Sequence, residues 1–399
     1  MEERGFILSQ PEAGAGVSAN HRLHRYGIRH PVSWWPGAIF YLLSVLRRAV
    51  LSKSIFKAAG YGLLALATLD IAARIDDALN EGADFWKPYS IANVFQPSQF
   101  GLEGKPEMRY GKWSMNQLGY RGPDPVPGRT NVVIFGASET FGLYESAGRE
   151  YARVLENLLN PDAGREHYNV VNLGIPGTRL GRSGYLVRGI EQVHAKIAVI
   201  YPSPANYIGT TVPLCDKPSL PVSSDGGMSG YLRIVGKFEQ LAKKYVPIKL
   251  LTAVRQFSIW RDTRHVAVID RVPEATIDAF KADLACQANA AQSAGAKVIL
   301  VTHANYFGRD LLLADMPIMI SWRRFYPELK ESGFLDLERR ANTAIQEVGL
   351  KLGIDIVDAA SQIPAGPQYF ADFVHFTDAG SAKMAALLKP AVLKLGVSP

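Results

Sequence analysis

The feature of this chain that most restricts its fold is a series of short apolar runs that alternate with amphipathic stretches. The apolar runs, rich in β-branched residues, are expected to be strands at 131–136, 168–173, 196–201, 296–301 and 354–358. The stretches that follow them have helical spacing and are expected to be helices at 146–160, 181–194, 274–294, 331–353 and 377–395. This alternation predicts an α/β fold with a parallel sheet covered by helices on both faces.

A serine stands where the first apolar run passes into a helix. Ser138 lies within Gly136-Ala-Ser-Glu-Thr-Phe-Gly142, directly after the run Asn131–Phe135. Open α/β sheets bind ligands at the carboxyl ends of their strands, and N–H groups at a helix start stabilise anions. Ser138 is therefore a candidate nucleophile, and the alternative interpretation is a serine that only caps the helix.

Three further motifs occupy comparable positions, two of them directly after expected strands. They are Asn172-Leu-Gly-Ile-Pro-Gly177, Pro204-Ala-Asn206-Tyr, and Asp372-Phe-Val-His375 just before the last expected helix. Serine, glycine, asparagine and histidine in this order resemble the SGNH (GDSL-like) hydrolase superfamily, over roughly residues 110–395. Upstream, Asn116–Gly122 resembles the lead-in before the serine block of membrane-anchored bacterial members.

The resemblance implies a three-layer α/β/α, flavodoxin-like fold and a serine esterase or acyl hydrolase. Ser138 would attack an ester carbonyl, His375 would take its proton, and Asp372 would orient the imidazole. The N–H groups of Ser138 and Gly177 and the amide of Asn206 would form the oxyanion hole. An imidazole base predicts activity that rises with a pKa of about 6–7.

The chain departs from the family pattern beside these residues. Ala137 and Tyr207 each stand where the family usually has Asp. Gly177, rather than Gly174, matches the family's oxyanion glycine. With these departures, a binding protein that keeps the fold but lacks turnover is an alternative function.

A second Asp-x-x-His pair, Asp262 and His265, needs to be weighed against Asp372 and His375. It lies between the third motif and the expected strand 296–301, far from the C-terminal position that the fold requires for the base. The alternative role for this pair is a surface ion pair with a neighbouring arginine.

The same site residues allow a second reaction, and the sequence also bears on cofactors and substrates. O-acyl transfer to, or deacetylation of, a cell-surface polysaccharide would use the same acyl-enzyme. The sequence shows no metal-ligand spacing and no phosphate-binding glycine loop, so neither a metal nor another cofactor is expected. The expected partner is a small-molecule, glycan or lipid ester, whose acyl and alcohol parts stay open, as does the oligomeric state.

Positive charge is concentrated at the start of the chain. Of the net charge of +7, residues 1–57 contribute +5, from eight Lys and Arg against three Glu. A nucleic-acid enzyme would carry its basic residues near its site, so no nucleic-acid partner is expected. The basic stretch leads into the apolar segment Ala58–Ala73, which contains Asp70, and acidic residues follow. This order predicts a cytoplasmic N-terminus and an exported body.

These patterns divide the chain into four parts. They are a basic segment at 1–53, a candidate transmembrane anchor at 54–76, a lead-in linker at 77–128, and an SGNH hydrolase domain at 129–399 with an insert at about 207–273. The expected location is the inner membrane, with a periplasmic or extracellular catalytic domain. A second membrane or interfacial helix is expected at 34–46, and the alternative is a helical hairpin packed on a soluble domain. Whether Cys215 and Cys286 pair stays open.

Overall fold

The computed structural model describes residues 53–162, 167–181, 183–215, 232–245, 257–258, 260–261, 264–307, 322–323 and 325–396. The predictions for residues 1–52, including the run at 34–46, lie outside the described residues, as does Asp262. Parts of the predicted insert and of the segment 306–326 also lie outside them.

Five parallel strands form the central sheet, in the order β6-β5-β7-β8-β9. Their bounds are β5 Thr130–Gly136, β6 Tyr168–Asn172, β7 Ile197–Tyr201, β8 Lys297–Val301 and β9 Asp355–Val357, each within one residue of its predicted range. The strands β6 and β7 are buried along their whole length, which explains their continuous apolar runs. The predicted α/β fold with a parallel sheet is confirmed, and the strand order is that of flavodoxin-like doubly wound sheets.

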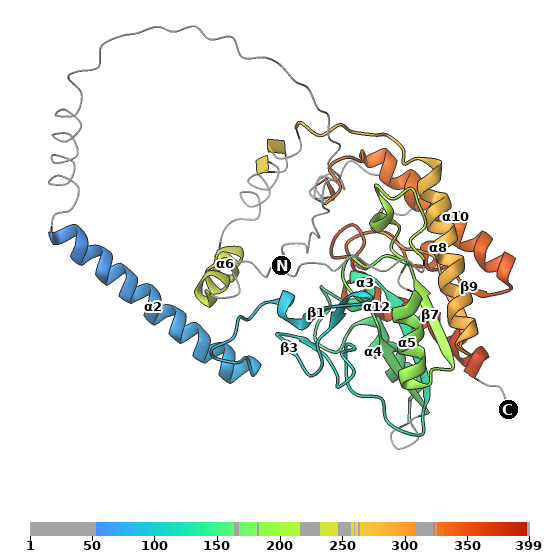
Figure 1. Ribbon diagram of the computed structural model, residues 1–399, viewed down its shortest axis with the longest axis horizontal. Helices are drawn as coiled ribbons and strands as arrows, with labels where there is room; N and C mark the ends of the chain where they lie inside the picture. Colours follow the sequence, from blue (N-terminus) through green and yellow to red (C-terminus); the bar gives the residue numbers. More distant parts are fainter. Residues whose placement is uncertain are drawn as a thin grey trace, which may run out of the picture.

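The helices that flank the sheet form two packed groups. Their bounds are α4 Tyr151–Leu159, α5 Ser183–Val193, α8 Glu274–Ser293, α10 Glu331–Leu352 and α12 Asp378–Gly396. The helix α4 packs against α12, whereas α8 packs against both α5 and α10 (Figure 1). The helix predicted from 146 begins only at Tyr151, and the N–H of Ser146, in the turn before it, donates to Asp378 Oδ1 at 2.7 Å.

The segment predicted as a lead-in linker contains two small antiparallel hairpins. After the 3₁₀ helix η1 (Ile91–Val94), strand β1 (Phe95–Ser98) pairs with β2 (Gly101–Gly104), and β3 (Arg109–Tyr110) pairs with β4 (Trp113–Ser114). The rings of Phe95 and Trp113 lie 5.4 Å and 6.2 Å from the ring of Phe141, which follows the candidate serine. The hairpins therefore pack on the sheet domain as part of its apolar core.

A long helix, α2 (Lys53–Glu81), extends away from the sheet domain (Figure 1). Its residues Phe56–Glu81 are numerous and apolar enough to cross a membrane, and only 6% of the most apolar part is buried. A signal sequence passes the same test of length and composition. The helix is longer than the predicted anchor at 54–76, and α6 (Arg233–Tyr245) packs against it.

Candidate active site

Two of the predicted site residues follow neighbouring strands of the sheet. Ser138 begins the short helix α3 (Ser138–Phe141) after β5, and Asn206 lies in the 3₁₀ helix η2 (Pro204–Tyr207) after β7. The strands β5 and β7 pair directly, and they meet where the order of the sheet reverses. This reversal is the point at which open α/β sheets bind their ligands.

Asp372 and His375 form the carboxylate–imidazole pair that the sequence motif predicts. His375 Nδ1 lies 2.7 Å from Asp372 Oδ2. The other oxygen of Asp372 accepts hydrogen bonds from the N–H groups of Val374 and His375, both at 2.9 Å. The backbone of the turn 372–375 thus fixes the position of the Asp372 carboxylate. His375 Nε2 is buried and has no hydrogen-bond partner among the described residues, which leaves it available to a hydroxyl.

The surroundings of His375 favour its protonated form. Burial lowers the pKa of His375, but Asp372, with smaller contributions from Glu139 and Glu145, raises that pKa to about 9. The ligand-free protein therefore carries a proton on this imidazole at neutral pH. The value lies above the range of about 6–7 expected for an ordinary imidazole base.

Ser138 makes its hydrogen bond with the residue that follows it. Its hydroxyl donates to Glu139 Oε2 at 3.2 Å, and no hydrogen bond joins Ser138 to His375, both of which are described. Glu139 is buried, and its Oε1 accepts a hydrogen bond from Ser203 Oγ at 2.8 Å. Catalytic hydrogen bonds often form only when substrate binds, so this resting arrangement leaves the nucleophile assignment open to test.

A buried ionic network behind the serine did not emerge from the sequence. His303 follows β8, and its Nδ1 lies 2.7 Å from Glu338 Oε2 while its Nε2 lies 3.3 Å from Glu139 Oε1. Burial lowers the pKa of His303, but the two glutamates raise it to about 10. Burial raises the pKa of Glu139, but His303 lowers it to about 2. The signal in the sequence was a histidine next to a strand end at the same edge of the sheet as Ser138.

The two glycines of the second motif have different roles. The N–H of Gly174 donates to Asn172 Oδ1 at 2.8 Å, and a Cβ on Gly174 would stand only 2.5 Å from the backbone nitrogen of Phe141. Gly177 is exposed, with φ of +72°, and its N–H has no partner among the described residues. Gly174 therefore allows close packing on α3, whereas Gly177 keeps a donor free.

Asn206 is partly committed to its neighbours. Its Nδ2 donates to the carbonyl of Thr178 at 2.7 Å, and its Oδ1 lies 3.3 Å from the hydroxyl of Tyr326. An amide nitrogen carries two hydrogens. One hydrogen of Asn206 is therefore left for an oxyanion.

Tyr207, which departs from the family pattern, fastens the start of the insert to α8. Its hydroxyl donates to Asp283 Oδ2 at 2.7 Å, and the N–H groups of Leu214 and Cys215 donate to the other oxygen of Asp283, each at 2.8 Å. Cys215 also forms a disulfide with Cys286, whose Cα lies 6.3 Å away. The pairing that the sequence left open is thus formed.

The lead-in motif supplies a buried cation beneath the serine helix. Arg121 donates to the carbonyls of Phe141 and Gly142, the latter at 2.7 Å, and its Nη2 lies 3.2 Å from Glu150 Oε2. These carbonyls are at the C-terminal end of α3, where a helix favours positive charge. Arg121 therefore connects the lead-in to the position of Ser138.

We expect Arg121→Met to lower the free energy of unfolding by about 3–5 kcal/mol, because it leaves Glu150 as an uncompensated buried charge. Urea unfolding in detergent solution, followed by tryptophan fluorescence, measures this loss. The control is Arg149→Met on the exposed turn before α4, with an expected change within about 0.5 kcal/mol. Equal effects of the two substitutions would contradict the assigned role of Arg121.

Among the residues that the structure describes, no group of three or more His, Cys, Asp and Glu side chains is arranged to hold a metal ion.

Comparisons with known proteins give only structural likenesses. No family model matches the sequence, and no curated protein matches it. A lipase/acylhydrolase from Enterococcus faecalis is 17% identical with a TM-score of 0.39, over 66% of this chain and 95% of that chain. A GDSL-like lipase from Bacteroides thetaiotaomicron is 18% identical with a TM-score of 0.37, and the match covers 68% of this chain and 91% of that chain. A catalytic mutant of an acetylxylan esterase from Geobacillus stearothermophilus is 11% identical with a TM-score of 0.39, and the match covers 68% of this chain and 97% of that chain. Because these TM-scores are below 0.5, function is inferred from the site of this chain.

Proposed function

We propose that the protein is a serine acyl hydrolase that cleaves an ester through an acyl-enzyme. The observation that carries the proposal is the Asp372–His375 pair, whose Nε2 has no partner among the described residues. The ring of Tyr144, in the turn after the serine helix, lies 5.1 Å from the imidazole. Glu139, the neighbour of Ser138, also contributes to the raised pKa of His375. Both observations support a location of His375 beside the serine.

In this mechanism, the Ser138 hydroxyl turns from Glu139 toward His375 Nε2. The oxygen attacks the ester carbonyl while the imidazole takes its proton, and Asp372 stabilises the resulting imidazolium. The N–H groups of Ser138 and Gly177 and the free amide hydrogen of Asn206 hold the oxyanion. The imidazolium then protonates the leaving alcohol, and a water molecule, activated in the same way, releases the acid.

A binding protein without turnover is a second candidate function. It is favoured by the hydrogen bond from Ser138 to Glu139 and by the raised pKa of His375. Together these features describe a serine that is not activated in the resting state at neutral pH.

Covalent labelling separates these two functions. We expect a fluorophosphonate probe to label the wild type at pH 9 on Ser138, as located by peptide mapping, and to leave Ser138→Ala unlabelled. A panel of short-chain and long-chain esters and acetylated glycans, with release and transfer both measured, then distinguishes hydrolase from transferase. An unlabelled wild type throughout pH 7–10 would favour the binding protein.

We also propose that α2 anchors the chain in a membrane, with the N-terminus cytoplasmic and the sheet domain outside. The exposed apolar helix supports this placement, as does the Cys215–Cys286 disulfide, since disulfides persist in oxidising compartments. We expect alkaline phosphatase to be active when fused after residue 90 and inactive when fused after residue 50. Release of the full-length protein from membranes by carbonate without detergent would contradict the anchor.

A further inference from the structure

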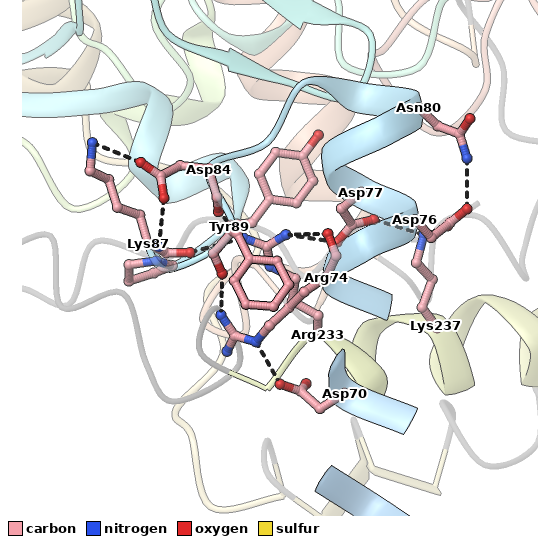
Figure 2. A network of polar contacts seen from close by, with 12 residues as sticks. Asp70, Arg74, Asp76, Asp77, Asn80, Asp84, Lys87, Tyr89, Arg233 and Lys237 are labelled. Carbon is pink, nitrogen blue, oxygen red and sulfur yellow. Dashed lines mark hydrogen bonds and ion pairs between the residues drawn. The ribbon is translucent and has the colours of Figure 1, made fainter. Parts of the chain in front are cut away.

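The helix α6, which follows a part of the insert, is fastened to the second half of α2 by charged side chains (Figure 2). Lys237 Nζ lies 2.6 Å from Asp76 Oδ2 and 2.8 Å from Asp77 Oδ1. Arg233 Nη1 lies 3.7 Å from the other oxygen of Asp77. Two basic side chains one turn apart on α6 thus face two adjacent carboxylates of α2.

Asp70 of α2 lies beside the first turn of α6. Its Oδ2 lies 2.7 Å from Arg74 Nε, and its Oδ1 accepts a hydrogen bond from the N–H of Ile234 in the first turn of α6 (Figure 2). The part of α2 before Asp70, residues 53–69, is about 26 Å long at 1.5 Å per residue. Lys53 and Lys57 lie in this part, so its uncharged run, 58–69, is about 18 Å long, and the lysine stems would have to extend it toward the roughly 30 Å of a bilayer's hydrocarbon core. Asp70, the carboxylate within the apolar sequence of α2, is therefore paired with Arg74 where the uncharged run of the helix ends.

Arg233 of α6 contacts both α2 and the chain segment that follows it. Its side chain is only 1% exposed, and its Nη2 donates to the carbonyl of Lys87 at 3.0 Å and to that of Asp84. Its guanidinium also lies 5.2 Å from the ring centre of Tyr89. The chain that leaves α2 is thereby held against α6, and Trp86 of that chain is 83% exposed.

One face of α6 is apolar and uncovered among the described residues. Three exposed side chains recur every three positions and are between 48% and 53% exposed: Val235, Phe238 and Leu241. Such spacing defines a single face of a helix. At about 100° per residue, Arg233 and Lys237, which bind α2, lie to one side of Phe238, and Lys237 is next to Leu241. The contact with α2 therefore leaves the apolar face of α6 uncovered.

We propose that this face of α6 lies in the interfacial zone of the membrane that α2 spans. The inference rests on the proposed anchor, because the run of α2 without charged residues ends at Asp70, the level where α6 begins. An amphipathic helix with basic residues beside an apolar face lies flat in the headgroup region, and an exposed tryptophan such as Trp86 is typical of that zone. The lipid bilayer thus covers this face of α6.

The test uses the full-length protein in vesicles of phosphatidylethanolamine and phosphatidylglycerol at about 7:3, a mixture that supplies the anionic lipid attractive to a basic helix. A polarity-sensitive fluorophore is attached to a cysteine introduced by Phe238→Cys or, as a control on the opposite side of the helix, by Gly236→Cys, at an exposed position where an added Cβ would meet nothing within 4 Å. Labelling without reductant preserves the native disulfide. Spin-labelled acyl chains in the same vesicles serve as quenchers.

We expect at least twofold stronger quenching at position 238 than at position 236, together with a blue-shifted emission at 238 only. Flotation of both proteins with the vesicles, and its resistance to carbonate, tests the α2 anchor separately. Equal quenching at the two positions in proteins that float would overturn the inference for α6 alone. In a parallel sample of unlabelled Phe238→Cys protein, a disulfide-linked dimer formed through position 238 in vesicles would also overturn it, because a second copy would then cover the face.

Discussion

Ser138→Ala and His375→Ala are each expected to lower the rate of ester hydrolysis by about a thousandfold or more, while the protein stays folded. The first removes the attacking oxygen, and the second removes the base paired with Asp372. Steady-state hydrolysis of the best ester from the panel measures the rate, and circular dichroism measures the fold.

The matched control is His265→Ala, which changes the other Asp-x-x-His pair. His265 is exposed, and its ring nitrogen accepts a hydrogen bond from its neighbour Arg264 at 2.9 Å. We expect activity close to that of the wild type. A His265→Ala enzyme without activity, or a Ser138→Ala enzyme with more than about a tenth of the wild-type rate, would show that the wrong residues were assigned.

The pH profile of kcat/KM is expected to rise with an apparent pKa near 9. This parameter reports groups of the free enzyme, and the free enzyme holds the pKa of His375 at about 9. Since Glu145 is one of the groups that raise this pKa, Glu145→Gln should move the rise to lower pH. Initial rates between pH 5 and 10.5, at substrate concentrations well below KM, measure both profiles. A wild-type rise at pH 6–7 would contradict the raised pKa.

The same pair links activity to stability. The folded-state pKa of His375 is above its ordinary value of 6.5, so protonation favours the folded protein. This contribution is fully present below about pH 6.5 and is lost as the pH rises through about 9. The neutral imidazole, which the proposed mechanism needs as the base, therefore appears in the pH range where this stabilising contribution disappears.

Glu139 is the unusual group beside the candidate nucleophile. Its charge is retained in a buried site because His303 is protonated between it and Glu338. A fixed negative charge near His375 stabilises the imidazolium that forms when Ser138 gives up its proton. The same carboxylate holds the Ser138 hydroxyl in the resting state, so substrate binding would need to release it.

Local patterns were enough to place the strands of the sheet, most of the helices that flank it and the Asp372–His375 pair. Asn131–Phe135 reads as one apolar run because a central parallel strand is covered on both faces. Asp372 and His375 are three residues apart, and the turn between them brings carboxylate and imidazole together. Contacts within a few residues depend on backbone geometry that the sequence itself encodes.

Contacts between distant segments were decided only by the tertiary structure. Glu139 and His303 are 164 positions apart, and Cys215 and Cys286 are 71 apart. The amphipathic pattern of α6 is visible in the sequence, but its pairing with the carboxylates of α2 is not. A local pattern shows that a side chain is polar, apolar or reactive. Which partner it meets depends on how the packed strands and helices bring remote parts of the chain within a few ångströms.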